Sequence, residues 1–497
     1  LDEKQRPAAE KDAWSNPVAM PKWASVPAAV RTPLTLAPEA ERENPPVPTA
    51  AVPVTPPAIA DTRLDNGLQL VVARTGEVPL ATMALVIKGG GATDPKGRAG
   101  LSDMTASIAT RGTATRSQKQ IAAEMEALGA SLSTSAGADG TIISVTAPVA
   151  TLEAAGRILV DIVRNASFPA EEFDRERGQS LDKLSVALKD PGTLSALALR
   201  RVIYGDAPYG AVTTPETLRA MTRDELVAQR DRWWRPDNAA LIVTGGVDRE
   251  QAAAMGNRLF SGWQSIGPAA IAPALRAGTA QAPRLIVIDM PGAGQAAVAT
   301  AVRAVDRNDP AYPDLLVANA VLGSGSNGRL FQEIRTKRAL SYGANSALAA
   351  RADDGMLIAA SQTKNESAPE VVAIFLAEFD KLAREPLDAE TVGQRKAYLS
   401  GAVSRQAETS GGFAIILAGL VQQGLPSAEA ARLVERIAAV TPEAASAAAA
   451  ANTPSARASV VVVGDAKLFI DKLRAAHPQV EVIGIDSLDL NRPQLRK

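Results

Sequence analysis

Cysteine is absent from this chain of 497 residues, and histidine occurs once, at His477. Without cysteine the chain can form no disulfide, thiolate zinc site, iron–sulfur cluster or thiol nucleophile. With one histidine, any motif that needs two imidazoles is excluded, and a Ser-His-Asp triad would have to use His477. Aromatic residues make up only 4% of the chain, so the core must consist mainly of aliphatic side chains.

An excess of either charge is also missing, because 53 Lys and Arg residues stand against 54 Asp and Glu residues. The net charge of −1 provides neither the basic surface of a nucleic-acid-binding protein nor a polybasic membrane signal. No run is long and apolar enough to cross a bilayer. We therefore predict no nucleic-acid partner and no membrane span, in a globular protein with 46% apolar residues.

Residues 1–60 differ from the rest in proline content, since they contain 12 of the 33 prolines. Proline removes an amide donor and fixes φ, so this region is predicted to be an irregular or polyproline-like tail. The alternative is an extended surface arm anchored by Trp14 and Trp23. Because the chain begins with Leu1, we expect an exported protein of the periplasm without its leader, with the cytoplasm as the alternative.

The pattern after the tail predicts a first group of strands and helices. Strands are expected at 63–72 (a pair joined by a type I′ turn at Asn66-Gly67), 81–87, 131–135, 141–147 and 239–245. Helices are expected at 100–109, 117–128, 151–165, 170–188, 192–203, 215–219, 223–232 and 249–261.

A second group follows in a similar order. Strands are expected at 284–288, 295–302, 341–351, 355–363 and 459–463. Helices are expected at 311–322, 328–340, 367–384, 388–406, 411–422, 427–438, 442–451 and 466–476. Local matches about 218 residues apart, such as 241–245 with 460–464, indicate an internal repeat.

These patterns predict a tail at 1–60, domains at 61–266 and 284–497, and a linker at 267–283 that is rich in Ala, Pro and Gly. Strands and helices are clustered and do not alternate strictly. Each domain is therefore predicted to be α+β, with helices covering a mostly antiparallel sheet.

Several segments resemble the insulinase/pitrilysin-type zinc metallopeptidases, particularly the half-size forms similar to mitochondrial processing peptidase. They are Gly100-Leu-Ser-Asp-Met-Thr-Ala-Ser107, 171–184, 204–210, 234–245 and, in the second half, 322–342. The resemblance spans about 61–490 and includes the repeat. It implies two homologous domains arranged as a clam around a chamber for peptides.

The chain departs from this family at the zinc positions. Active members carry His-x-x-Glu-His on the helix that begins near Gly100, and a third ligand, Glu, about 76 residues further on. The matching positions here hold Asp103, Ala106, Ser107 and Lys183. A methyl group cannot act as a base, and an ammonium has no lone pair for a metal. We predict no cofactor in this chain and zinc in a partner subunit. Asp103 and Lys183 are expected to form an ion pair across the vacated site or to remain two solvated charges.

Arg335 and Tyr342 match the pair that, in the family, helps to hold the substrate or its transition state. A guanidinium and a phenol can both donate to a peptide carbonyl or a developing oxyanion. Their separation of seven residues is nearly two helical turns, which predicts that both side chains project to one side. The alternative is that Arg335 pairs with a carboxylate such as Glu333 and that Tyr342 only begins a strand.

The run Gly323-Ser-Gly-Ser-Asn-Gly328 formally matches the dinucleotide motif G-x-G-x-x-G. That motif requires a preceding strand and a nearby acid, whereas a helix is expected at 311–322 and the nearest candidate acids are at 353–354. The run resembles a shortened form of the glycine-rich loop of the non-catalytic processing-peptidase subunit. We predict that it binds substrate, with a flexible interhelical turn as the alternative. The predicted binding residues are Gly323, Gly325, Ser326 and Gly328.

The resemblance therefore predicts a non-catalytic subunit, inactive alone, that forms a heterodimer with a homologous zinc-bearing subunit and takes part in proteolysis of peptides. Arg335 and Tyr342 would act in the partner's site. Leu85–Gly90 is expected as an exposed edge strand that can receive a peptide by main-chain hydrogen bonds. The alternative function is a purely structural subunit, like the core proteins of the cytochrome bc complex.

Overall fold

The computed structural model describes residues 37–42, 57–76 and 78–497. The chain divides into two units, residues 1–53 and 54–497. The described part of the first unit contains the 3₁₀ turn η3 (Glu39–Glu41). The surface arm proposed around Trp14 and Trp23 lies outside the described residues. All other elements belong to the second unit.

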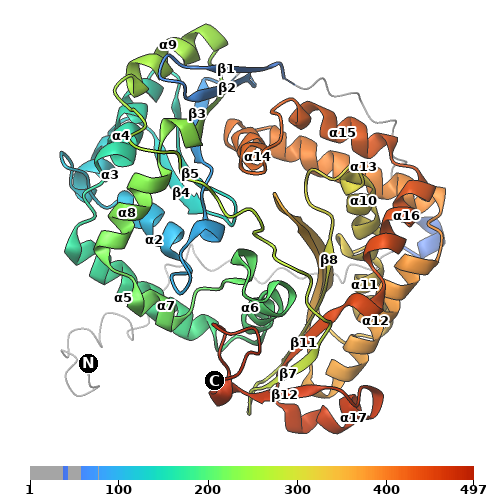
Figure 1. The fold of residues 1–497 in the computed structure, drawn as a ribbon. Helices are drawn as coiled ribbons and strands as arrows, with labels where there is room; N and C mark the ends of the chain where they lie inside the picture. The colour runs from blue at the N-terminus through green and yellow to red at the C-terminus, as the bar shows by residue number, and fades with distance from the viewer. Residues whose placement is uncertain (1–36, 43–56, 77) are drawn as a thin grey trace, which may run out of the picture. The chain divides into compact units, whose positions relative to one another are not determined.

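The first half of that unit is built on a six-stranded sheet with the strand order β1-β2-β6-β3-β5-β4 (Figure 1). Neighbouring strands are antiparallel, except that β2 and β6 run parallel. The strands are β1 (Ile59–Arg63), β2 (Gln69–Arg74), β3 (Leu80–Ile87), β4 (Ser131–Ala136), β5 (Thr141–Pro148) and β6 (Ala239–Gly245). The helices are α2 (Leu101–Ala109), α3 (Gln118–Ala127), α4 (Leu152–Asn165), α5 (Ala170–Ala187), α6 (Pro191–Tyr204), α7 (Pro215–Ala220), α8 (Arg223–Trp233) and α9 (Arg249–Phe260).

The second half has its own six-stranded sheet with the order β12-β7-β11-β8-β10-β9. Its strands are β7 (Leu285–Asp289), β8 (Ala296–Ala304), β9 (Ala344–Ala350), β10 (Gly355–Thr363), β11 (Ser459–Gly464) and β12 (Glu481–Gly484). Its helices are α10 (Tyr312–Gly323), α11 (Arg329–Phe331), the π-helical η7 (Gln332–Lys337), α12 (Ala368–Arg384), α13 (Ala389–Ala407), α14 (Ser410–Gln422), α15 (Glu429–Ala439), α16 (Pro442–Asn452) and α17 (Ile470–Ala476).

The two sheets repeat one topology, as the internal sequence matches predict. Strands β2, β6, β3, β5 and β4 occupy the places that β7, β11, β8, β10 and β9 occupy in the second sheet. The pair β2–β6 is parallel, and so is its counterpart β7–β11. The outer strands differ, since β1 is antiparallel to β2 whereas β12, which the sequence pattern did not predict, is parallel to β7. Both sheets are mostly antiparallel, so the predicted α+β class is confirmed.

Two local predictions are wrong. The β1–β2 hairpin does form, but its turn is not type I′, which would need a positive φ at both Asn66 and Gly67. Only Gly67 has one (85°), after a turn closed by its N–H on the carbonyl of Leu64 (2.9 Å). Strand β3 is an interior strand paired with β5 and β6, so Leu85–Gly90 is not an edge. In the described part of the chain the edge strands of that sheet are β1 and β4, and β4 pairs with β5.

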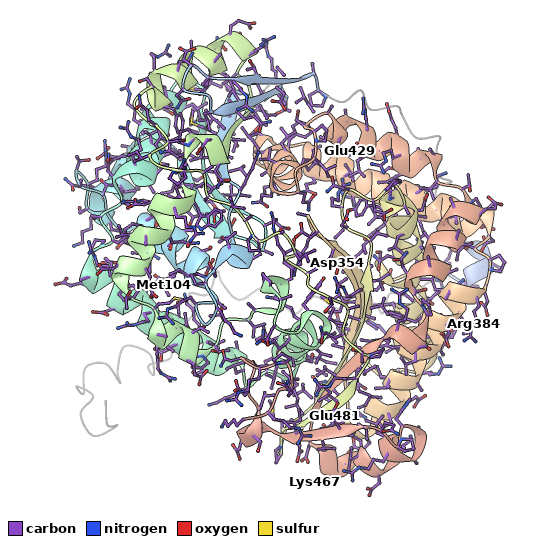
Figure 2. The ribbon with its side chains drawn as sticks, in the orientation of Figure 1. Met104, Asp354, Arg384, Glu429, Lys467 and Glu481 are labelled. Carbon is purple, nitrogen blue, oxygen red and sulfur yellow. The ribbon has the colours of Figure 1, made fainter. Side chains whose placement is uncertain are left out.

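The central strands are apolar on both faces, and each face has a different cover. All residues of β6 and β11 are buried. On one face of the first sheet, residues such as Leu70 and Val72 pack with α2, α4 and α9 around Met104 (Figure 2). The corresponding face of the second sheet packs against α10, α12 and α16.

The opposite faces are covered by helices from the other half of the chain. Phe413, Leu417 and Val421 of α14 pack on the first sheet, against Val71, Val86 and Ile242. Leu194, Leu199 and Val202 of α6 pack on the second sheet, against Ile286, Ala299 and Val461. Figure 1 shows α14 beside β3 and α6 beside β8. Each half therefore covers one face of the other half's sheet. Among the described residues, no helix combines the length and the apolar character needed to cross a membrane.

This exchange of helices predicts that α14 stabilises the whole second unit. Replacing the fully buried Leu417 by alanine should lower the free energy of unfolding by about 2–5 kcal/mol, because it leaves a cavity against the first sheet. Ile415→Ala is the matched control, since Ile415 lies on the same helix with 59% of its surface exposed. Its effect should stay within about 0.5 kcal/mol in the same urea titration. Equal effects of the two substitutions would show that α14 does not hold the sheet.

Candidate functional site

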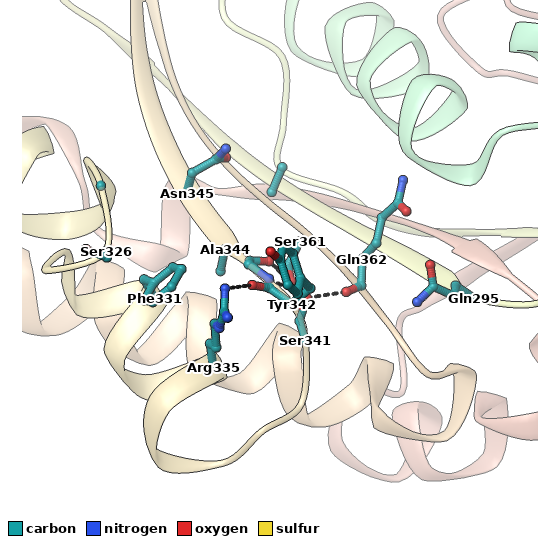
Figure 3. A pocket seen from close by; sticks show the side chains of 13 residues that line it. Gln295, Ser326, Phe331, Arg335, Ser341, Tyr342, Ala344, Asn345, Ser361 and Gln362 are labelled. Carbon is teal, nitrogen blue, oxygen red and sulfur yellow. Dashed lines mark hydrogen bonds between the residues drawn. The ribbon is translucent and has the colours of Figure 1, made fainter. Parts of the chain in front are cut away.

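A cavity of about 650 Å³ in the second half brings together most of the predicted binding residues (Figure 3). Arg335 and Tyr342 lie in its wall together with Gly325 and Ser326 of the glycine-rich run. The remaining lining residues are Gln295, Phe331, Ser341, Gly343, Ala344, Asn345, Ala360, Ser361 and Gln362. Phe331 and Ser341 lie within the segment 322–342 but were not predicted as binding residues, and the other seven come from separate segments around β8, β9 and β10 and form no motif of their own.

Arg335 and Tyr342 contact each other directly. The Nη1 atom of Arg335 donates to the backbone carbonyl of Tyr342 (2.9 Å), as the dashed line in Figure 3 shows. The guanidinium also lies over the ring of Tyr342, 4.3 Å from its centroid, and 5.2 Å from that of Phe331. These contacts restrict the side chain of Arg335 before any ligand arrives. The ring of Tyr342 remains 87% exposed and therefore open to a ligand.

The path of the chain that produces this contact differs from the predicted continuous helix at 328–340. Helix α11 widens into the π-helical η7, and Ala339 then adopts a left-handed φ of 50°. The N–H of Leu340 bonds to the carbonyl of Ile334 (2.9 Å), which closes the turn. Arg335 and Tyr342 meet because the chain reverses here, and not because they stack along one helix. π-Helical turns of this kind occur often at functional sites.

The alternative partner of Arg335, Glu333, is engaged elsewhere. Its carboxylate accepts hydrogen bonds from Lys337 (2.5 Å) and Arg338. These two cations lower the pKa of Glu333 to about 2. Among the described residues, Arg335 forms no ion pair, so its charge is available to the cavity.

The four residues predicted from the glycine-rich run have two different roles in the structure. Gly325 and Ser326 line the cavity, where the carbonyl of Ser326 accepts a hydrogen bond from Gln332 (2.7 Å). Gly323 and Gly328 do not line it. A side chain on Gly323 would lie 2.4 Å from the backbone nitrogen of Ser346, and one on Gly328 would lie 2.7 Å from Gly323. These two glycines permit close approach of the backbone.

Helix α2 keeps the place of the zinc helix without its ligands. Its N-terminus is held by Asp94, whose carboxylate accepts from the N–H groups of Gly100 (2.9 Å) and Ser102 (2.9 Å) and from the Ser102 hydroxyl (2.6 Å). The same hydroxyl accepts a hydrogen bond from Gln229 of α8 (2.9 Å). Burial of its carboxyl outweighs these hydrogen bonds and raises the pKa of Asp94 to about 6.

The four degenerate zinc positions lie on α2 and α5. Asp103 and Lys183 are exposed and line one cavity of about 320 Å³, Ala106 is buried and Ser107 is half-buried. No ion pair joins Asp103 to Lys183 in the described part of the chain, so the structure supports two solvated charges. The carboxyl of Asp103 reaches solvent but lines a recess, where desolvation and, to a lesser degree, the charge of Glu176 raise its pKa.

These residues do not fit zinc. The four positions supply one carboxylate, one hydroxyl, a methyl group and an ammonium, whereas zinc sites are built from imidazole, thiolate and carboxylate ligands. Within residues 57–76 and 78–497, no group of three or more His, Cys, Asp or Glu side chains is arranged to hold a metal ion. No step of metal chemistry is therefore assigned to this chain.

Comparison with protein families matches both halves. A model described as insulinase, peptidase family M16, matches residues 70–213. A model described as the peptidase M16 inactive domain matches residues 220–399. The chain is 28% identical over 306 residues to an uncharacterized zinc protease of Mycobacterium leprae, which covers 60% of this chain and 68% of that protein. It is 26% identical over 269 residues to the mitochondrial-processing peptidase subunit beta of Neurospora crassa, or 53% of this chain and 56% of that protein.

Solved structures share the fold. A peptidase M16 inactive domain from Pseudomonas fluorescens superposes with a TM-score of 0.75 at 22% identity, over 82% of this chain and 98% of that one. A chain of complex III2 from Candida albicans superposes with a TM-score of 0.69 at 14% identity, over 85% of this chain and all of that one. At these identities the likeness concerns the fold alone.

The raised pKa of Asp94 predicts a specific pH dependence of stability. Between the unfolded value of about 3.9 and the folded value of about 6, the folded chain holds a proton that the unfolded chain has released. Stability therefore falls as the pH rises through this range. The asparagine side chain of Asp94→Asn cannot ionise, so this variant does not lose stability in this way as the pH rises. We expect the melting temperature of the wild type to fall relative to that of Asp94→Asn between about pH 4 and about pH 7. If the melting temperatures of the wild type and of Asp94→Asn change in parallel over this pH range, the prediction is contradicted.

Proposed function

Because the chain belongs to the insulinase family (peptidase family M16) and is a non-catalytic member, we propose that it is one subunit of a heteromeric metallopeptidase. Its partner is a homologous chain that carries His-x-x-Glu-His, binds zinc and activates the attacking water. The relative from Neurospora crassa, a subunit of a processing peptidase by its name, supports a paired arrangement. The complex cleaves peptides. The periplasm stays a prediction for its location.

One observation carries this proposal: the Arg335–Tyr342 pair is preorganised in a chain whose zinc positions are lost. The Tyr342 carbonyl engages one nitrogen of Arg335, which leaves further guanidinium N–H groups as donors. The phenol of Tyr342 is exposed beside them. Both groups can donate to a peptide carbonyl, and their hydrogen bonds strengthen when that oxygen becomes an oxyanion. The cavity that the pair lines has a volume of about 650 Å³ and has room for peptide residues next to the pair.

A peptide also needs contacts that do not depend on its sequence. Gly325 and Ser326 line the cavity beside Arg335, and their main-chain groups can contact a peptide backbone. Binding by these residues stays a prediction. A purely structural subunit would share the fold, as the chain of complex III2 does, but it has no use for two adjacent donors in an open cavity. We therefore favour the peptidase role.

The pair can be tested in the mixed complex by two substitutions. Arg335→Ala removes the guanidinium, and Tyr342→Phe removes only the hydroxyl and keeps the ring under Arg335. Each should lower kcat for peptide cleavage, with a loss of about 2.7–4 kcal/mol of transition-state stabilisation for one oxyanion donor. Assembly, followed by gel filtration of the mixture, should be unchanged.

Lys337→Ala is the matched control. Lys337 lies on the same helical segment, pairs with Glu333 at the surface and does not line the cavity. Its removal costs at most about 1 kcal/mol of stability and should leave kcat unchanged. If Arg335→Ala and Tyr342→Phe cleave at the wild-type rate in an intact complex, the pair has no catalytic role and the scaffold function replaces the proposal.

A further inference from the structure

A second cleft, of about 310 Å³, shares no lining residue with the Arg335 cavity. Both halves of the chain build it. The first half provides Asp103 of α2, Ala136 at the end of β4 and Arg200 of α6, and the second half provides Arg351, which follows β9. The cleft exists because α6 packs on the second sheet and so brings Arg200 toward that half.

Three carboxylates that lie within three residues of lining residues in the sequence, but do not line the cleft, are engaged by other cations. Asp139 accepts hydrogen bonds from the hydroxyl of Tyr209 (2.5 Å) and from Arg276 (2.8 Å). Asp353 also lies near Arg276 (3.7 Å), and Asp354, labelled in Figure 2, pairs with Arg303. The side chains of Arg200 and Arg351 form neither a hydrogen bond nor an ion pair with any residue that the structure describes. Two cations thus face the cleft without an ion pair among the described residues, although Asp94 and Asp103 also line it.

The two arginines are held in position. The guanidinium of Arg351 lies over the rings of Tyr209 (4.7 Å to the centroid) and Tyr204 (5.6 Å). Both rings are buried, and the hydroxyl of Tyr209 is fixed on Asp139. Arg200 lies one helical turn before Tyr204 and is half-buried. Burial, and then the charge of Arg351, lower the pKa of Arg200, in agreement with two cations that lie close together. Arginine remains protonated under such conditions.

We propose that Arg200 and Arg351 bind the carboxylate of a peptide in this cleft. A guanidinium pairs with a carboxylate through two parallel hydrogen bonds, and a bound anion removes the repulsion between the two cations. Asp94 and Asp103 line the same cleft, which favours a singly charged carboxylate over a doubly charged phosphate. The strand β4, at the end of its sheet in the described part of the chain, reaches this cleft at Ala136, and an edge strand can offer main-chain groups to a peptide backbone. The site needs neither the partner subunit nor Arg335, so it goes beyond the function proposed above.

Fluorescence anisotropy on the full chain alone tests the site with three dansyl-labelled peptides. The first is hexa-alanine with a free C-terminal carboxylate, the second is its C-terminal amide, and the third is the amide with one internal glutamate. The free acid should bind at least about tenfold more tightly than the plain amide. If the glutamate peptide binds as tightly as the free acid, the site accepts the carboxylate of an acidic side chain. If the glutamate peptide binds as weakly as the plain amide, the site recognises the C-terminal carboxylate.

Substitutions locate the binding. Arg200→Gln and Arg351→Gln should each weaken binding of the tighter peptide about tenfold or more, whereas Arg200→Lys keeps the charge but loses the paired hydrogen bonds and should fall between Arg200→Gln and the wild type. Arg351→Gln loses the contact with Tyr209 and so could fail to fold. In that case Arg200→Gln decides the outcome, because the side chain of Arg200 forms no hydrogen bond or ion pair among the described residues. Arg249→Gln, an exposed cation of α9, is the control and should bind like the wild type.

Three results would overturn the proposal: no binding of any of the three peptides, equal binding of the free acid and the plain amide, or wild-type affinity in Arg200→Gln. Competition provides a further check on the ligand chemistry. Acetate should displace the tighter peptide at lower concentration than inorganic phosphate does, and the reverse order would contradict the assignment to a carboxylate.

Discussion

Burial of both faces of the central strands is the constraint on which this structure depends. Strands β6 and β11 are mostly apolar and buried along their whole length, and such a strand needs a cover on each side. Each half covers only one face of its own sheet, and the other face is covered by α14 or α6 from the other half. Each half therefore depends on the other to bury one face of its sheet. The same packing brings Arg200 of α6 beside Arg351, and so creates a cleft that neither half could form alone.

Most of the fold could be predicted from the sequence because its strands and helices carry strong periodicity. The predicted strand at 355–363 and the helix at 170–188 agree with β10 and α5 to within one residue. The errors occur where tertiary contacts decide. The pattern of β3 does not distinguish an edge from an interior strand, and the short β12 has too few residues to show a period. The widening of the helix at η7 depends on the chain reversal around Ala339.

The candidate site was predictable only where a motif carried it. The family resemblance of segment 322–342 pointed to Arg335 and Tyr342, although the physical reason for their contact is a reversal of the chain and not helical stacking. Arg200 and Arg351 lie in different halves and form no motif, so only the structure brings them together. The absence of zinc ligands and the presence of two adjacent donors fit the function proposed above. In that proposal the chain takes no part in metal chemistry and supplies groups that can bind and polarise a peptide.

That account makes the chain dependent on a partner, and the rate of peptide cleavage in a mixing titration tests this most directly. A family member that carries His-x-x-Glu-His is held at fixed concentration while this chain is added, with zinc content measured for each component. The account predicts no cleavage and no stoichiometric zinc for this chain alone, and a rate that rises and saturates at a fixed ratio as the complex forms. Cleavage by this chain alone, or a partner rate that does not change across the titration, would contradict it.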